Sequence, residues 1–288
     1  MSQTGPSETA TPQSEKNDAG LAPGMAAETG GSDTLVCFII AGIVATGLSA
    51  AAIAHSDDYF QLPEELTSQI GISSELKARF DAGEISGGEV MGMGMSEQDP
   101  ELQSKINAAR RKNHVNNTAL SLSLIGLLVA GCLGCGAGFA RKSRSLSIIG
   151  LLTGIVLGSG LGAVGGLAST WTEDALMGSE KVDQMVRTIA MHAAGWAVIG
   201  IAVGLSVGLP NQASRSLKFV GAAVSAGVLS AALFTIGAAV IFSGENADLP
   251  VPDGTGNRLL WTGLCAVAMA IMIGLVANNT TNRSVDAS

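Results

Sequence analysis

Six long runs of apolar residues alternate with polar segments along this chain. None of the runs contains Asp, Glu, Lys or Arg, and each is long enough, or nearly so, to cross the roughly 30 Å core of a bilayer. Only helices and closed barrels satisfy the backbone in lipid, and the runs lack the alternation of barrel strands. The pattern predicts an all-α, polytopic integral membrane bundle with six transmembrane helices, over residues 34–54, 119–140, 147–168, 188–208, 219–242 and 259–277.

A row of glycines runs through the third predicted span, and a shorter row through the fourth. Glycine is costly in a soluble helix, but in a bilayer it allows close packing of helix backbones. A four-residue spacing drifts by about 40° per step, so we expect the row to meet two neighbours and this span to lie centrally. Glycine-zipper packing is predicted at Gly150, Gly154, Gly158, Gly162 and Gly166, and at Gly200, Gly204 and Gly208.

The two ends of the chain are polar. Residues 1–33 are rich in Ser, Thr, Gly and Pro, which predicts a disordered cytoplasmic tail, and residues 278–288 form a second tail. The first span, 34–54, ends in Ala-Ile-Ala, which resembles a signal-peptidase site. A signal peptide has a short basic region directly before its apolar run. Here the preceding segment is long and its nearest charges are acidic, so we expect a retained span, with cleavage as the alternative.

Residues 55–118 are the only sizeable segment between spans. Pro63 and Pro100 are each followed by Glu, which is typical of a helix start. The second of these helices is expected to run towards Arg110 and into the second span. One interpretation of the segment is a pair of surface helices lying on the bundle, and the other is a docking surface or lid.

The sequence Ser-Arg-Ser-Leu occurs twice, at 143–146 and at 214–217, between consecutive spans. Glycines on both sides keep similar distances from it. We therefore predict a parallel internal repeat of residues 119–168 and 188–242, with its axis along the membrane normal. The matched glycines are Gly134 with Gly204, Gly138 with Gly208, Gly150 with Gly221 and Gly166 with Gly237.

Charge distribution predicts the orientation. Connectors 141–146 and 209–218 contain basic residues and no acid, whereas connectors 169–187 and 243–258 are mainly acidic. The positive-inside rule places the basic connectors and both termini in the cytoplasm of a bacterial cell, and residues 55–118 outside. Trp171 and Trp261 fall at outer span ends, where interfacial aromatic residues are common. The basic stretch 110–112 lies outside, against this rule. The basic connector residues are Arg141, Lys142, Arg144, Arg215 and Lys218.

Two features could carry chemistry. Cys132 and Cys135 form Cys-x-x-Cys on one helix face, with Cys37 at comparable depth, which suits a redox pair or a soft-metal site. The alternative is that these are small residues in a glycine-rich interface. His192 could titrate near neutrality within a span, so it is a functional candidate. Its alternative role is a hydrogen-bonded structural histidine.

Composition narrows the function. Apolar residues make up 47% of the chain and charged residues 14%, without the dense basic patch of a nucleic-acid binder. No catalytic or phosphate-binding motif is present, so we expect neither an enzyme nor a cofactor. The expected function is a structural or interaction protein, such as a scaffold or assembly factor, of a bacterial cytoplasmic membrane. Its partners would be the lipid bilayer and other membrane proteins or itself. The alternatives are a small-solute or ion permease and a membrane thiol-redox protein.

Overall fold

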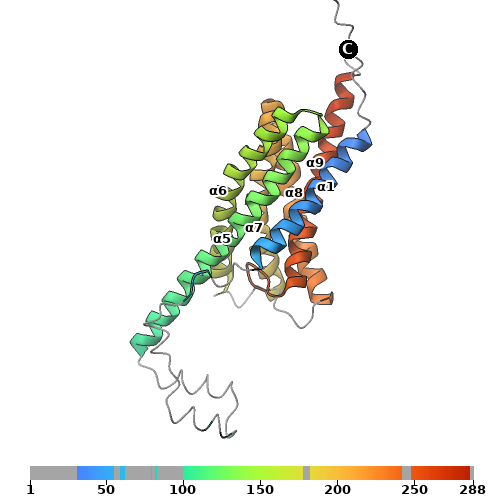
Figure 1. The fold of residues 1–288 in the computed structure, drawn as a ribbon. Helices are drawn as coiled ribbons and strands as arrows, with labels where there is room; N and C mark the ends of the chain where they lie inside the picture. The colour runs from blue at the N-terminus through green and yellow to red at the C-terminus, as the bar shows by residue number, and fades with distance from the viewer. Residues whose placement is uncertain are drawn as a thin grey trace, which may run out of the picture.

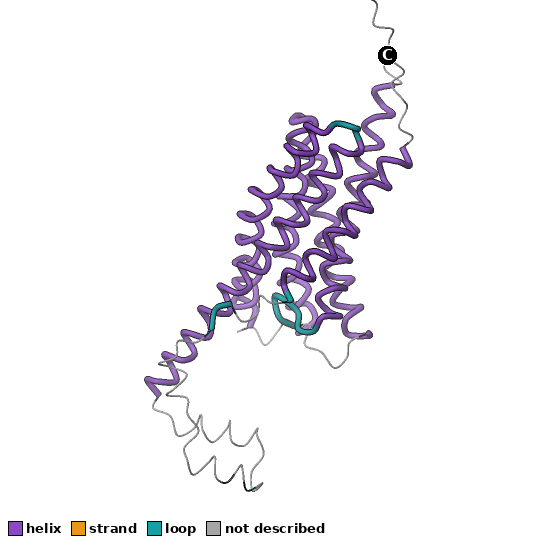
Figure 2. The backbone as a smooth tube through the Cα atoms, viewed as in Figure 1, coloured by secondary structure: helices purple, strands orange, loops and turns teal. Residues whose placement is uncertain are grey.

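A computed structural model describes residues 31–54, 59–61, 79, 82, 100–177, 182–241 and 248–285. Within these ranges the chain is helical, and six helices are long and apolar enough to cross a membrane, as predicted (Figures 1 and 2). The predicted tail over residues 1–30 and the helix start at Pro63 lie outside the described residues. The elements are α1 (Gly31–Ile53), α5 (Pro100–Ala140), α6 (Arg144–Met177), α7 (Gln184–Gln212), the short 3-10 helix η1 (Ala213–Arg215), α8 (Ser216–Ile241) and α9 (Thr255–Val285).

Helix α5 is continuous from Pro100 to Ala140, as its start signal predicts. Its 41 residues correspond to about 60 Å, and its N-terminal turns project beyond the bundle (Figure 1). Two predicted tails are shorter than expected, because α1 includes residues 31–33 and α9 continues to Val285. Apolarity marks the part of a helix that suits lipid, whereas polar residues extend the same backbone hydrogen bonding beyond it.

The connector between α5 and α6 is a tight turn. The backbone N–H of Ser143 donates to the carbonyl of Gly138 over 3.0 Å, and Lys142 adopts a left-handed conformation with φ 53°. This geometry is typical of a helix C-terminus. The Ser143 hydroxyl then accepts the N–H of Leu146 over 3.3 Å and caps α6. The turn therefore returns the chain antiparallel to α5.

The six helices form a closed ring in the order α1, α5, α6, α7, α8 and α9. Helices α5, α7 and α9 also contact one another, so they lie on the inside. Residues 121–130, 191–200 and 261–270 share one pattern, in which two buried residues alternate with two half-buried ones. The most apolar stretch is 56% buried in α5 and α7 but only 28% buried in α1 and α6.

The expectation that the third span lies centrally is therefore wrong. Helix α6 is on the outside, and Leu152 and Val156 are 56% and 69% exposed. Its glycine row faces α5 along its whole length, not two successive neighbours. A row with a period of four can stay on one partner if the two helices wind right-handedly around each other, because four exceeds 3.6 residues per turn.

The glycine row brings the backbones of α5 and α6 into direct contact. A Cβ atom added at Gly158 would lie 2.2 Å from the carbonyl oxygen of Gly126, and one at Gly162 would lie 2.3 Å from that of Leu122. Such distances leave no room for any side chain. The same holds on α7, where a Cβ at Gly204 would lie 2.3 Å from Cα of Val220 on α8. The other predicted glycines, Gly150, Gly154, Gly166, Gly200 and Gly208, also face backbone atoms of the neighbouring helix within 3.0 Å.

Serine hydroxyls link three pairs of helices. Ser123 of α5 donates to the carbonyl of Ser159 on α6 over 2.9 Å, and Ser169 of α6 donates to that of Met191 on α7 over 3.0 Å. Ser206 of α7 donates to the carbonyl of Ala130 on α5 over 3.1 Å. These bonds satisfy polar groups inside the bundle and tie the inner helices to their neighbours.

Three glycines at equivalent positions lie in the contacts of three helix pairs. Gly134, Gly204 and Gly274 recur at one interval along the chain and face α6, α8 and α1 respectively. The pairs α5–α6 and α7–α8 meet backbone to backbone at these glycines, whereas Gly274 of α9 meets mainly the side chain of Leu35 on α1. Two predicted glycine matches, Gly150 with Gly221 and Gly166 with Gly237, do not hold in space, because neither Gly221 nor Gly237 approaches the backbone of another helix. Gly150 is packed against α5, but its match Gly221 has open space where a side chain would stand.

The inside of the bundle is filled by large apolar side chains. Those on the inner helices are fully buried and extend along most of the bundle: Ile125, Val129 and Leu133 on α5, Ile199 and Val203 on α7, and Met269 and Ile273 on α9. The end with connector 141–143 and η1 is called the basic end below, and the opposite end is called the acidic end. Helix α1 begins and α9 ends at the basic end (Figure 1).

Candidate functional site

Polar side chains gather where α5 enters the bundle at the acidic end. Arg111, His114, Thr118 and Ser121 lie three or four residues apart, so they share one face of α5. They precede or begin the uncharged run of α5. Helix α6 ends at the same level because α5 and α6 run antiparallel, and this places Glu173 beside them.

Glu173 is the centre of an ion cluster. It is 5% exposed, and its Oε2 lies 3.2 Å from both Arg111 Nη1 and His114 Nε2. The second arm of Arg111 donates to the carbonyl of Thr170 over 3.0 Å and also pairs with Asp174. The basic stretch 110–112, which opposes the positive-inside rule, is thus compensated in part by acids from α6.

The cluster favours an ionised carboxylate at Glu173, which lies beyond the uncharged run of α6. Burial raises the pKa of Glu173, but hydrogen bonds and charges from His114 and Arg111 outweigh burial and hold its pKa below the usual range. The carboxylate therefore stays charged near neutral pH and fixes both basic side chains.

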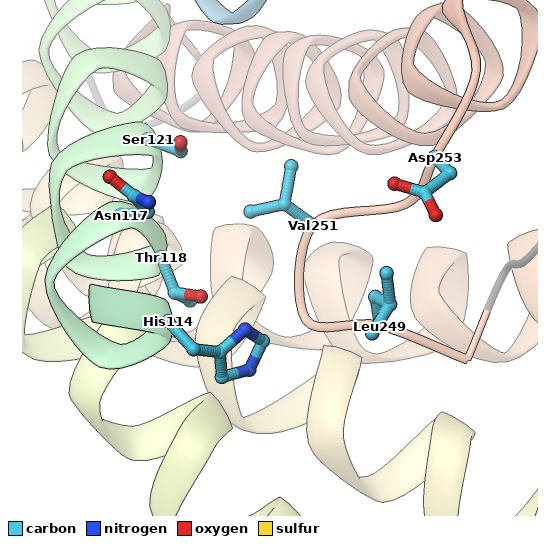
Figure 3. Close-up of a pocket in the computed structure, with 7 residues that line it drawn as sticks. All are labelled: His114, Asn117, Thr118, Ser121, Leu249, Val251 and Asp253. Atoms are coloured by element: carbon cyan, nitrogen blue, oxygen red, sulfur yellow. The ribbon is translucent and has the colours of Figure 1, made fainter. Parts of the chain in front are cut away.

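A small polar cavity of about 180 Å³ lies next to this cluster. Figure 3 shows His114, Asn117, Thr118 and Ser121 along α5 on one side, and Leu249, Val251 and Asp253 of the chain before α9 on the other. The Asn117 amide also exchanges hydrogen bonds with the backbone of Phe60, at 3.0 and 3.3 Å. The cavity is therefore bounded by α5 and by the segment before α9, which is distant from it in sequence.

This arrangement serves structure better than catalysis. A histidine oriented by a carboxylate is one part of many nucleophilic sites. Here the same carboxylate is also paired with Arg111, which neutralises it and reduces its effect on His114. The cluster instead joins the projecting part of α5 to the end of α6. In the described part of the chain, no group of three or more His, Cys, Asp or Glu side chains is placed to hold a metal ion.

His192, which the sequence suggests as a functional candidate, lies in an aromatic cluster inside the bundle, near the acidic end. It is 1% exposed, and its ring centroid is 5.2 Å from Phe234 and 5.6 Å from Trp261. Trp196 and Trp261 are 5.3 Å apart in an edge-to-face arrangement. Trp261 is 1% exposed, so its ring faces the core of the bundle, whereas Trp171 is 74% exposed. The packing of α9 on the inside of the ring turns Trp261 into a core residue.

Cys37, Cys132 and Cys135 line one groove of about 360 Å³ between α1 and α5, near the basic end. Their comparable depth was predicted, and all three thiols are free. The fourth cysteine, Cys265, is fully buried on α9. The groove is otherwise apolar and open to the outside of the bundle, and Ile40 and Phe139 on its wall are 55% and 62% exposed.

Sequence reasoning missed Arg258 as well as the Glu173 cluster. Arg258 is 8% exposed, and its guanidinium donates to the carbonyls of Pro252 and Ile53 over 2.8 and 3.0 Å. It thereby caps the C-terminal end of α1 with a positive charge. The spacing of polar residues along α5 was the available signal for the cluster. The contact of Arg258 with Ile53 gave no such signal, because the two residues are 205 positions apart.

No protein-family model, no curated protein and no solved structure matches this chain.

Proposed function

We propose that this chain is a multi-pass scaffold or assembly protein of a bacterial cytoplasmic membrane. Its six helices would cross the bilayer, with α5, α7 and α9 forming a rigid centre. The single observation that carries the proposal is the filled interior, in which large apolar side chains from all three inner helices are fully buried. An axis packed with apolar side chains suits a structural role better than passage of a polar solute.

The outer surface supports membrane insertion. Large apolar side chains of α1, α6 and α8 face away from the bundle, including Ile43, Val156 and Val240 at 58%, 69% and 78% exposure. Water would disfavour so much contiguous apolar surface, whereas lipid chains would cover it. The glycine rows of α6 and α7 would then act as glycine zippers, because close backbone contact is a main source of helix association in lipid.

The charges support an orientation. The basic connectors share one end of the bundle with the beginning of α1 and the end of α9, and the positive-inside rule assigns that end to the cytoplasm. The Glu173 cluster and the projecting N-terminal turns of α5 would then be external. A rigid external helix gives a scaffold a surface for another protein.

Reconstitution and cross-linking together would test the function. The full chain in proteoliposomes is expected to leave ion and small-solute flux at the level of empty liposomes. Cross-linking in intact cells, from single cysteines on the exposed face of α5 such as Ala108→Cys, is expected to yield a defined partner or a homo-oligomer. Flux that saturates with substrate would overturn the scaffold in favour of a permease.

A membrane thiol protein is the second candidate, because three cysteines line one groove. Cys135→Ser and Cys265→Ser form a matched pair of variants, since Cys265 lies outside the groove. A thiol function predicts that only Cys135→Ser abolishes the cellular phenotype at normal expression. The scaffold predicts that both variants behave like the parent chain.

A further inference from the structure

The cysteine-lined groove has the shape and position of a site for a lipid chain. Its α1 wall extends from Cys37 to Val44 and its α5 wall from Cys132 to Phe139, which corresponds to about 10 Å along each helix. Leu151 of α6, whose side chain lies against Gly131 of α5, completes the lining at the end of the groove away from the basic end. An open apolar groove on the surface of a membrane bundle excludes water and is filled by hydrocarbon.

Positive charges lie at the end of this groove. Arg141 and Lys142 follow directly on the end of α5, whose wall residue Phe139 is in the groove, and Arg144 begins α6. The described connectors at this end contain no acid. The nearby acid Asp33 lies in the first turn of α1, where it complements the positive end of that helix. The groove therefore combines an apolar wall with a cationic mouth.

The positive charges at the basic end carry an energetic cost. Burial and, after it, the charge of Arg215 lower the pKa of Arg141. Lys142 has a left-handed backbone with φ 53°, a position that glycine adopts more easily.

We propose that this groove binds one anionic phospholipid, with an acyl chain along α1 and α5 and its phosphate at Arg141, Lys142 and Arg144. Basic sites at the cytoplasmic ends of membrane helices recognise anionic headgroups in this way. The inference rests on the proposed membrane location. Charge complementarity selects an anionic lipid over a neutral one, and the groove distinguishes a lipid from free phosphate.

Photo-cross-linking tests the site. The purified full chain in mild detergent is illuminated with phosphatidylglycerol that carries a diazirine in one acyl chain, and labelled peptides are identified by mass spectrometry. Labelling is expected to concentrate on residues 37–44 and 132–139. Unlabelled phosphatidylglycerol should displace it, whereas phosphatidylcholine and inorganic phosphate should not. Labelling that is spread equally over α6 and α8 would overturn the site, and so would equal displacement by phosphatidylcholine.

Charge variants sharpen the test. Each surface cation adds about fivefold to the affinity for anionic lipid, so R141Q with K142Q should weaken labelling about 30-fold. Lys218→Gln removes a charge from the other connector and should leave labelling unchanged. Lys142→Gly keeps the turn and should weaken labelling about fivefold, and Lys142→Arg should retain it, which separates charge from folding. Charge variants that label like the parent chain would refute the headgroup contact.

Alkaline extraction of native membranes separates this inference from the proposed function. A chain released by the extraction would overturn the membrane location and the site together. A chain that stays inserted but shows no preference for anionic lipid would overturn the site alone.

Discussion

Replacing Gly158 with alanine should separate α5 from α6 and destabilise the bundle. The added Cβ would lie 2.2 Å from the carbonyl oxygen and 2.6 Å from the carbonyl carbon of Gly126, and real Cβ contacts essentially never fall below 3.0 Å. Both atoms belong to the backbone, so no rotamer change relieves the clash. Gly160 on the same helix is the matched control, because an added Cβ there would have nothing within 4 Å.

The structure sets the sign and size of both effects. Relief of the Gly158 clash requires the helices to move apart by about 1 Å, and a gap of that size forfeits a quarter to a half of the attraction in each contact. The neighbouring contacts at Gly154 and Gly162 would loosen as well. Overpacking of this kind costs about 1–3 kcal/mol, against a gain of at most about 1 kcal/mol from replacing glycine in a helix. Gly158→Ala should therefore destabilise, and Gly160→Ala should be neutral or stabilising.

Thermal unfolding in one detergent, followed by tryptophan fluorescence, measures the difference. Trp196 and Trp261 are buried in the core and report its loss. We expect the midpoints of the two alanine variants to move in opposite directions from the parent chain, and Gly158→Leu to be worse than Gly158→Ala. Equal midpoints for Gly158→Ala and Gly160→Ala would refute the close backbone approach.

Three further predictions concern orientation, the ion cluster and the tail. In a background without native cysteines, a membrane-impermeant thiol reagent applied to intact cells should label Asp253→Cys but not Ser143→Cys, and the reverse pattern would invert the topology. Glu173→Gln should cost about 1–3 kcal/mol because it leaves basic partners unsatisfied, whereas the exposed Glu101→Gln should cost under about 0.5 kcal/mol. The pKa of Glu173 is lowered in the folded state, so its contribution to the free energy of unfolding is full above the ordinary carboxyl pKa of about 4.3. That contribution is lost as the pH falls through the lower folded pKa. Acid should therefore narrow the difference in stability between the parent chain and Glu173→Gln. Deletion of residues 1–30 should leave insertion into membranes unchanged, and degradation of the truncated chain would reveal a targeting role.

The sequence by itself determined where the apolar helices are. Uncharged runs in this chain are too long for anything but a helix of membrane-crossing length, and all six lie almost wholly within the helices of the structure. The Pro100 start signal also fixed the beginning of α5 correctly, since proline and an acid suit a first turn. These are local properties, and a local pattern is sufficient to specify them.

The glycine rows showed which faces of α6 and α7 make contact, because a helix that lacks side chains on one face can approach another backbone there. They did not show which helix would be the partner. Tertiary structure decided that α6 meets only α5 with its row, and that α1 pairs with α9 from the other end of the chain.

Only the tertiary structure decided which apolar residues are inside. In a soluble protein apolar side chains mark the core, but a helix suited to lipid is apolar on all sides, so hydrophobicity does not separate its inner from its outer face. Val129 and Val156 are the same residue type, yet one is buried in the core and the other is 69% exposed. The same limit hid the Glu173 cluster and Arg258, whose partners come from distant segments that are brought together only by the closure of the helix ring.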